Sequence, residues 1–341
     1  MVSNNRMPRR VRGILALIVS LFFFIPAACS PPRRPPEPDN LFWPPPPDPP
    51  RIKYLRSLYS EDDIGRVYSF KEKLFGKDYF DSMLRPYGVS ARDGKIAVAD
   101  ILMKRILIFD LNRRRLMVVG EEGAMRHPSA VVLDREGTIY VSDAGGQRIV
   151  LYDAGGRYKT AFPLKGSKTV SLALNENLGR LYVVDALGNK VIVLGLDGKR
   201  LFEFGGRGAS KGQFNMPLDI TIDRGGTVYV LDVRNFRVQV FDPEGTFITS
   251  FGSAGDGPGF FANPKGIAAD SDGHIYVTDA AFSNFQVFDR TGRVLLFVGG
   301  LGLRPGEMYL PAGISIDEQD RLYVADQLNK RVQIFQYIRS K

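Results

Sequence analysis

Few residues in this chain could carry metal or nucleophile chemistry. It has two histidines, His127 and His274, and a single cysteine, Cys29. His127 precedes a proline and His274 follows a glycine, so both stand in segments typical of loops and turns. A zinc site needs at least three protein ligands, which usually include several histidines. These residues therefore favour neither a zinc site nor any other metal or cofactor, and we expect none.

Phosphate chemistry is also poorly supported. The segment Gly166-Ser167-Lys168-Thr169 resembles the end of a phosphate-binding loop. Ser167 replaces the glycine that such a loop requires, and no strand-to-helix context follows. The chain's Gly-x-Gly runs also lack the setting of a dinucleotide site. We assign no catalytic residue, and the expected protein is not an enzyme.

The elements that position these residues come from a sequence motif that is repeated six times. A Pro-x-Gly-Ile start is followed by an Asp-x-x-Gly turn, Tyr-Val-x-Asp, and an aliphatic run ending in Phe-Asp; the clearest copies are 216–242, 263–289 and 310–335. Its second-strand aspartates are Asp100, Asp143, Asp185, Asp232, Asp279 and Asp326, which recur every 42 to 47 residues. That period, with strand alternation and Gly-rich turns, predicts one four-stranded propeller blade per unit. The fold class is therefore all-β, with six blades.

The fourth unit shows how a blade is built. Its strands are expected at 218–222, 227–231, 236–241 and 246–251, with glycine-containing turns between neighbours. The third unit is the most degenerate, because 171–175 lacks the Pro-x-Gly opening and its aspartate. The remaining turn aspartates are interpreted as turn formers: Asp93, Asp134, Asp223, Asp270 and Asp317.

The sixth unit contains only three strands before the chain ends at Lys341. An N-terminal strand, Ile52 to Leu58, lies outside the repeats and can complete it. Closing the ring in this way removes two exposed sheet edges. A short helix is also expected near 70–75, where Ser69 and Glu72 form a capping-box pattern.

The units resemble NHL repeats, a six-bladed propeller family, from Arg85 to Phe335; Gly-rich connectors such as 252–260 match as well. The resemblance implies one alternative function, because related propellers include metal-assisted hydrolases and lyases with a site in the central channel. Asp219 would be its carboxylate candidate, since it stands on an inner strand where other units have Ser, Ala or Gly. The simpler interpretation is a channel residue bound to water. His127 and His274 are expected on opposite faces of the ring, so they would not share a metal.

Residues 1–28 have the form of a signal peptide. Four arginines precede an apolar run from Gly13 to Ile25 that is short for a membrane span. Pro26-Ala27-Ala28 before Cys29 resembles a bacterial lipobox, although Pro26 stands where leucine is preferred. Ordinary signal cleavage with a free thiol is the alternative. By the same resemblance, Ser30 favours the outer membrane, periplasmic or surface-exposed, in the bacterial cell envelope.

Residues 29–50 are expected to be a lipidated cysteine followed by a proline-rich tether, and 51–341 the propeller. Eleven of the chain's 22 prolines lie between Pro31 and Pro50, which favours an extended spacer. Its apolar triplet Leu41-Phe42-Trp43 should find a groove, either on the protein's own body or on a partner.

The formal net charge of +9 falls to about +5 without residues 1–28. This is a weak argument for nucleic acid, and none is expected as a partner. Basic residues cluster in loops between second and third strands: Lys104, Arg105, Arg148, Lys190, Arg234, Arg237, Lys330 and Arg331. Some, such as Arg148, Lys190, Arg237 and Arg331, are expected to pair with the repeat aspartates.

Departures from the repeat mark the predicted partner-binding face, namely Met103, Lys104, Arg105, Arg234, Phe236 and Phe282. Aromatic and arginine side chains are common anchors of protein interfaces. The alternative is that Phe236 and Phe282 pack beneath neighbouring connectors. The leading interpretation is a lipid-anchored, non-catalytic module that binds or scaffolds an envelope protein or protein complex. A sensor for a glycan or peptide ligand is a further alternative.

Overall fold

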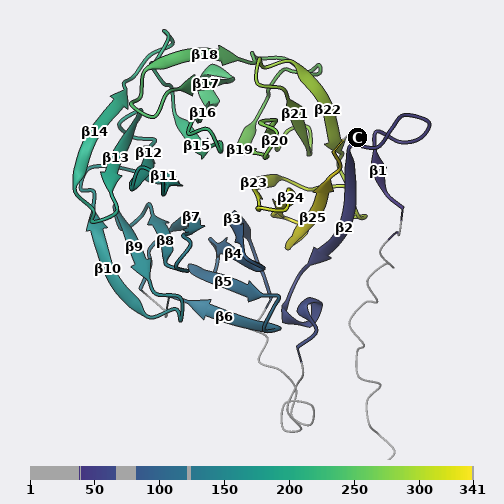
Figure 1. The fold of residues 1–341 in the computed structure, drawn as a ribbon, viewed down its shortest axis with the longest axis horizontal. Helices are drawn as coiled ribbons and strands as arrows, with labels where there is room; N and C mark the ends of the chain where they lie inside the picture. The colour runs from purple at the N-terminus through teal and green to yellow at the C-terminus, as the bar shows by residue number, and fades with distance from the viewer. Residues whose placement is uncertain (1–37, 39, 67–81, 121–123, 340–341) are drawn as a thin grey trace, which may run out of the picture. The chain divides into compact units, whose positions relative to one another are not determined.

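The computed structural model describes residues 38, 40–66, 82–120 and 124–339. Pro38–Lys341 forms one compact unit, a ring of six antiparallel sheets (Figure 1), and the inner strands line a central channel. The helix expected near 70–75 lies outside the described residues. In the part of the chain that is described, no helix is long and apolar enough to cross a membrane.

Five blades are built from consecutive strands, numbered from the channel outward. Blade one contains β3 (Pro86–Arg92), β4 (Lys95–Asp100), β5 (Arg105–Asp110) and β6 (Arg115–Val119); blade two contains β7 (Pro128–Leu133), β8 (Ile139–Asp143), β9 (Arg148–Tyr152) and β10 (Tyr158–Pro163). Blade three contains β11 (Thr169–Asn175), β12 (Arg180–Asp185), β13 (Lys190–Gly195) and β14 (Arg200–Gly205). Blade four contains β15 (Pro217–Ile222), β16 (Val228–Asp232), β17 (Arg237–Phe241) and β18 (Phe247–Phe251); blade five contains β19 (Pro264–Ala269), β20 (Ile275–Asp279), β21 (Asn284–Phe288) and β22 (Val294–Gly299). In blade four the expected strand bounds were correct to within one residue.

Blade six joins both ends of the body, which confirms the predicted ring closure. Its sheet has the order β1 (Phe42–Trp43), β2 (Ile52–Leu58), β25 (Arg331–Tyr337), β24 (Arg321–Asp326) and β23 (Pro311–Ile316). Strand β2 runs antiparallel to β25, with Ile52 opposite Tyr337 and Leu58 opposite Val332. A short 3₁₀ turn, η1 (Glu61–Ile64), then leads toward blade one.

Strand β1 comes from the segment that was expected to be a tether, and its position shows where the apolar triplet Leu41-Phe42-Trp43 packs. Trp43 packs edge-on against Phe335, with ring centroids 5.8 Å apart. Leu41 and Trp43 both lie against the cluster between blades five and six. The triplet therefore finds its groove on the protein's own body.

The core lies between neighbouring blades. Second strands such as β16 and β20 are buried at every position, because both of their faces pack against adjacent sheets. Outer strands are more exposed, and in β22 half-buried Val294 and Leu296 alternate with exposed Leu295 and Phe297. Side chains of second strands also bond the inner strand of the next blade, as where Thr278 Oγ1 of β20 donates to Ala312 O of β23 at 2.5 Å and Ser142 Oγ of β8 donates to Thr169 O of β11 at 2.7 Å. The ring is thus held by apolar packing and by inter-blade hydrogen bonds.

Candidate binding site at the mouths of the channel

The repeat aspartates lie in two sets, one on each face of the ring. The connector face carries the inter-blade connectors and the loops between second and third strands. Asp232, at the end of β16, accepts the Asn215 N–H of the preceding connector at 2.7 Å, and Asp326 accepts the Tyr309 N–H at 2.8 Å. Both carboxylates are completely buried. These aspartates therefore tie each connector to its own blade.

The opposite face, the turn face, carries the turns between first and second strands. Asp223 accepts the Thr227 N–H at 2.9 Å and the Tyr229 hydroxyl at 3.2 Å. Asp317 accepts the Arg321 N–H at 2.9 Å and the Tyr323 hydroxyl, also at 2.9 Å. The interpretation as turn formers is confirmed for Asp134, Asp223, Asp270 and Asp317, and in each case the tyrosine six residues later donates to the same carboxylate. Asp93 has no such tyrosine, because Ala99 stands at that position.

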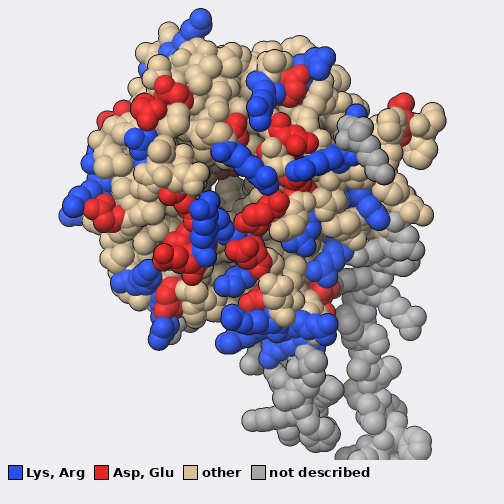
Figure 2. Space-filling view, in the orientation of Figure 1, with Lys and Arg blue, Asp and Glu red and all other residues tan. Residues whose placement is uncertain are grey.

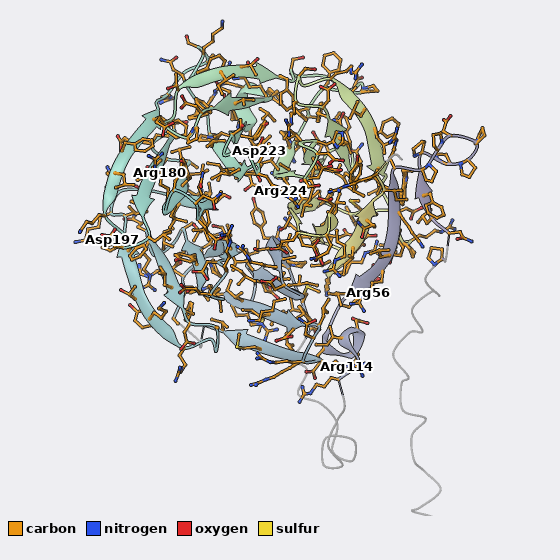
Figure 3. The ribbon with its side chains drawn as sticks, in the orientation of Figure 1. Arg56, Arg114, Arg180, Asp197, Asp223 and Arg224 are labelled. Carbon is orange, nitrogen blue, oxygen red and sulfur yellow. The ribbon has the colours of Figure 1, made fainter. Side chains whose placement is uncertain are left out.

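Charges at the turn-face mouth are paired within the protein. A cavity of about 370 Å³ is lined by the ends of all six inner strands. Arg92 contacts Glu176 at 2.9 Å and Glu318 at 3.4 Å, and Arg135 contacts Glu176 at 3.2 Å. Arg224 donates to the Glu318 carbonyl at 3.2 Å. Figure 2 shows basic and acidic side chains mixed around this opening, and Figure 3 marks Arg224 beside it.

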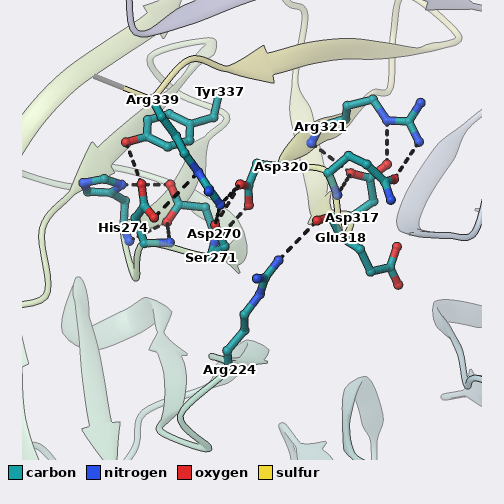
Figure 4. A network of polar contacts seen from close by, with 12 residues as sticks. Arg224, Asp270, Ser271, His274, Asp317, Glu318, Asp320, Arg321, Tyr337 and Arg339 are labelled. Atoms are coloured by element: carbon teal, nitrogen blue, oxygen red, sulfur yellow. Dashed lines mark hydrogen bonds and ion pairs between the residues drawn. The ribbon is translucent and has the colours of Figure 1, made fainter. Parts of the chain in front are cut away.

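A second polar network lies on the same face, around His274 (Figure 4). His274 Nδ1 lies 2.8 Å from Asp270 Oδ2, which also accepts the Tyr276 hydroxyl at 2.8 Å. The hydrogen bond to Asp270 raises the pKa of His274. Arg339 completes the network through Asp320, at 2.8 Å. His127 lies on the connector face, so the two histidines are on opposite faces as expected. Among the described residues, no group of three or more His, Cys, Asp or Glu side chains is arranged to hold a metal.

Asp219 lies inside the channel and joins three inner strands. Its carboxylate accepts hydrogen bonds from the Ser171 hydroxyl of β11, the Ile220 N–H of β15 at 3.0 Å and the Ile267 N–H of β19 at 2.8 Å. Burial raises its pKa to about 6, and these three donors oppose the shift. Burial, with the nearby Asp219 charge, also raises the pKa of Tyr87 to about 12. Three protein donors thus hold this carboxylate in place.

The connector-face mouth has a different character. Its pocket, of about 490 Å³, contains four basic side chains contributed by four different blades: His127, Lys168, Arg234 and Lys265. No carboxylate is present among the described residues that line it. The rest of the lining comprises Tyr87, Ser129, Ala144, Val170, Met216, Leu218, Val233, Phe236, Ala262 and Asn263. We refer to these fourteen residues as the connector-face pocket.

The cations of this pocket repel one another. Burial lowers the pKa of Lys265; Asp279 opposes the shift, and Arg234 adds to it. Arg234 and Lys168 are exposed. Across the described residues, the side chains of Lys168, Arg234 and Lys265 have no ion pair and no hydrogen-bond acceptor. An anionic group entering the pocket would supply both.

Of the eight basic loop residues, five have a partner within the protein and three have no ion pair in the described structure. Arg148, Arg237 and Arg331 pair with Asp143, Asp232 and Asp326 at 3.2, 2.9 and 2.8 Å, as predicted. Lys190 differs: it pairs with Glu203 at 3.0 Å, because the adjacent outer strand β14 presents a carboxylate. Arg105 is buried and donates to the Ser82 carbonyl at 3.1 Å. Lys104, Arg234 and Lys330 remain without an ion pair in the described structure.

The predicted partner face is therefore brought together only in part. Arg234 and Phe236 lie in the connector-face pocket, and Phe236 also packs against the core between blades four and five. Met103 and Lys104 lie on the β4–β5 loop of blade one, and half-buried Phe282 on the β20–β21 loop of blade five. Arg105 does not belong to an accessible face, because its position opposite Asp100 is enclosed. The residues missed from the sequence, Lys168 and Lys265, flank Thr169 and Pro264 at the starts of inner strands.

Comparison with known proteins agrees with this architecture. The NHL-repeat family model matches residues 214–241 and 261–288, within blades four and five. The chain thus carries NHL repeats in a six-bladed β-propeller.

Several solved structures share the fold. A streptogramin B lyase is 14% identical, with 75% of this chain and 94% of the other covered and a TM-score of 0.58. A gluconolactonase from Xanthomonas campestris is 15% identical, with coverages of 75% and 87% and a TM-score of 0.59. An auxiliary nutrient binding protein from Bacteroides thetaiotaomicron is 15% identical, with coverages of 75% and 69% and a TM-score of 0.60. Enzymes and binding proteins thus share this architecture.

Proposed function

We propose that this protein is a non-catalytic binding or scaffolding module of the bacterial cell envelope, anchored in the outer membrane by a lipid on Cys29. Its ligand is the acidic group of a partner protein, received in the connector-face pocket. The observation that carries this proposal is the contrast between the two channel mouths. Charges pair with one another on the turn face, whereas Lys168, Arg234 and Lys265 gather on the connector face in a pocket whose described lining includes no carboxylate.

The electrostatics favour an anionic ligand. Burial of Lys265 is the main reason that its pKa is lowered, and the charge of Arg234 adds to this effect, so both disfavour the charged lysine in the unliganded pocket. A carboxylate placed between Lys265 and Arg234 would relieve this repulsion and gain charge-assisted hydrogen bonds. A pocket that concentrates one sign of charge also steers an oppositely charged partner toward it.

The apolar part of the pocket favours a protein or peptide as the carrier of that anion. Met216 is 40% exposed, and half-buried Phe236 lies near Arg234 in the same lining. An aromatic side chain beside an arginine is the typical composition of an interface anchor. A peptide or acidic glycan would present the same carboxylate chemistry, so capture experiments should test both.

A second candidate, a metal-assisted hydrolase or lyase, is motivated by Asp219. A raised pKa inside a channel is typical of functional carboxylates, and similar propellers include a lyase and a gluconolactonase. The three donors to Asp219 support a structural role instead, because each belongs to a different inner strand. Binding of a divalent cation by calorimetry, abolished by Asp219→Asn, would favour the enzyme.

Capture from native membranes tests the proposal. Arg234→Glu with Lys104→Glu is expected to weaken partner capture about tenfold, which corresponds to ~1.4 kcal/mol. The melting temperature should stay nearly unchanged, because neither side chain has an ion pair within the described structure. Lys159→Glu with Lys199→Glu makes the same change in charge on outer elements of blades two and three, and should leave capture intact. Equal capture by both double variants would exclude this face as the binding site.

A further inference from the structure

Four large apolar side chains are exposed together on the connector face of blade six. Leu301 and Leu303 are 70% and 71% exposed, and Tyr309 and Leu328 are each 43% exposed. Leu301 bridges to Met308 across the connector, and the Leu328 N–H donates to the Tyr309 carbonyl at 3.1 Å. We refer to Leu301, Leu303, Tyr309 and Leu328 as the apolar ledge.

The repeats provide an internal control for this ledge. Three connectors share one parallel bridge, Arg207 to Phe214, Ala254 to Phe261 and Leu301 to Met308, so their residues align one by one. The four ledge positions correspond to Arg207, Ala209, Asn215 and Arg234 in blade four, and to Ala254, Asp256, Ala262 and Ala281 in blade five. The same backbone thus carries small or polar residues in two blades and large apolar ones in the third. The connector fold does not require the ledge.

The ledge is presented on a fixed backbone. Buried Arg331 donates to the carbonyls of Leu303, Arg304 and Glu307 at 3.2, 2.9 and 2.7 Å. Gln333 Oε1 accepts the Gly306 N–H at 2.9 Å. The two leucines therefore project from an ordered turn, and little conformational entropy would be lost when they are buried.

The N-terminal part of the body arrives beside the ledge. Leu41 and Trp43 pack directly over Gly306, leaving no room for a Cβ there. Strand β2 runs from the turn face at Ile52 to the connector face at Leu58, and β1 is antiparallel to it. The chain therefore enters β1 from the connector side, the side on which the ledge is exposed.

The charges around the ledge indicate which surface could cover it. Arg304 and Lys330 are exposed and, in the described chain, have no ion pair. Glu307, the nearby carboxylate, is half-buried and accepts the Arg304 N–H at 3.0 Å. Apolar side chains flanked by cations are the combination that binds the surface of an anionic bilayer.

We propose that the apolar ledge docks on an anionic lipid surface and turns the connector face of blade six toward the membrane. Leu41 stands twelve positions after Cys29, and twelve steps of an extended chain span roughly 37 Å, so a lipid on Cys29 and the ledge can reach one bilayer. This inference uses the anchor of the proposed function but not its pocket. The described lining of the pocket belongs to blades one to five, so it shares no residue with the ledge.

Hydrogen exchange of the full-length lipidated protein in vesicles tests the proposal. In vesicles containing anionic lipid, exchange at 301–310 and 326–330 is expected to slow about tenfold relative to detergent. The equivalent segments 207–216 and 232–236 of blade four, and 254–263 and 279–283 of blade five, should not change. Leu301→Ala with Leu303→Asp, which copies blade five, should abolish the protection while the protein still sediments with the vesicles.

Three results would overturn the ledge proposal. They are equal protection in all three blades, protection without vesicles at high protein concentration (which would indicate contact between copies), and failure of the protein to bind vesicles. Arg234→Glu with Lys104→Glu separates the two proposals: it should leave ledge protection unchanged even where partner capture is lost. Loss of ledge protection in that variant would also count against the lipid assignment.

Discussion

Arg331 and Asp326 form an ion pair of 2.8 Å in which both side chains are almost completely buried, in the blade that joins the two ends of the body. The guanidinium also donates to three carbonyls of the connector that carries the apolar ledge. Asp326 in turn accepts the Tyr309 N–H, the Asn329 side chain and the Gln333 side chain. One buried pair thus holds the third strand, the second strand and the connector in register.

Arg331→Met should be among the most destabilising single substitutions in the chain. It leaves Asp326 buried without its cation, a change that typically costs about 3–5 kcal/mol. Urea denaturation should show the loss in the free energy of unfolding. Arg148→Met, at the same position of blade two, is the matched control. Its loss should be smaller, because the Arg148 side chain is 34% exposed to solvent whereas that of Arg331 is 1% exposed. Equal losses would contradict a special role for blade six.

Ring closure predicts a second stability difference. Deleting residues 51–58 removes β2, exposes the edge of β25 and should lower the melting temperature or cause aggregation. Deleting 31–38 should leave the melting temperature unchanged. A deletion through residue 45 also removes Trp43, so an intermediate effect is expected rather than none. If deletions of 51–58 and 31–38 gave equal melting temperatures, the closing strand would contribute nothing to stability.

Repetition made most of the fold predictable from the sequence. Every blade has the second-strand aspartate, and blades two, four and five also have an Asp-x-x-Gly turn after the inner strand, so one mechanism explains each feature wherever it occurs. Strand β2 was predictable because the sixth unit lacked its outer strand. The docking of β1 was only half predictable, since an apolar triplet reveals that it needs a groove but not which one. Contact of Trp43 with Phe335 depends on three-dimensional packing that sequence spacing does not encode.

The candidate site was less predictable. Arg234 and Phe236 were found because they break the loop pattern, but Lys168 and Lys265 lie near strand starts, where a single lysine carries no signal. Arg105 looked accessible because the sequence does not reveal how deeply that loop position is enclosed. A residue's place on a face follows from the repeat, whereas its exposure depends on neighbouring blades.

The proposed lipid anchor predicts where the protein will be found in the cell. Cys29→Ala removes the only thiol that could be acylated and should release the body into the soluble envelope fraction. Membrane fractionation followed by immunoblotting measures this. Cys29→Ser removes the same thiol with a smaller change in polarity and should behave alike. Unchanged membrane association of both variants would show that the anchor lies elsewhere.

Asp219 predicts a pH dependence of stability whose sign follows from its raised pKa. Because burial raises the pKa of Asp219 to about 6 in the folded protein, from 3.8, the folded state binds more protons than the unfolded state between those values. This group's contribution to the free energy of unfolding should therefore fall as pH rises from about 4 to 6. Asp219→Asn cannot titrate, so its stability relative to the wild type should rise across that interval.

Urea denaturation at pH 4, 5, 6 and 7 would measure the Asp219 effect, with Ser171→Ala as the companion variant. Ser171 donates to the carboxylate and lowers its pKa, so its removal should move the pH-dependent interval upward. The two substitutions thus affect the same titration differently: Asp219→Asn abolishes it, and Ser171→Ala moves it to higher pH. If the free energies of unfolding of Asp219→Asn and the wild type changed in parallel with pH, this carboxylate would have its ordinary pKa. A carboxylate with an ordinary pKa would no longer support acid–base chemistry in the channel.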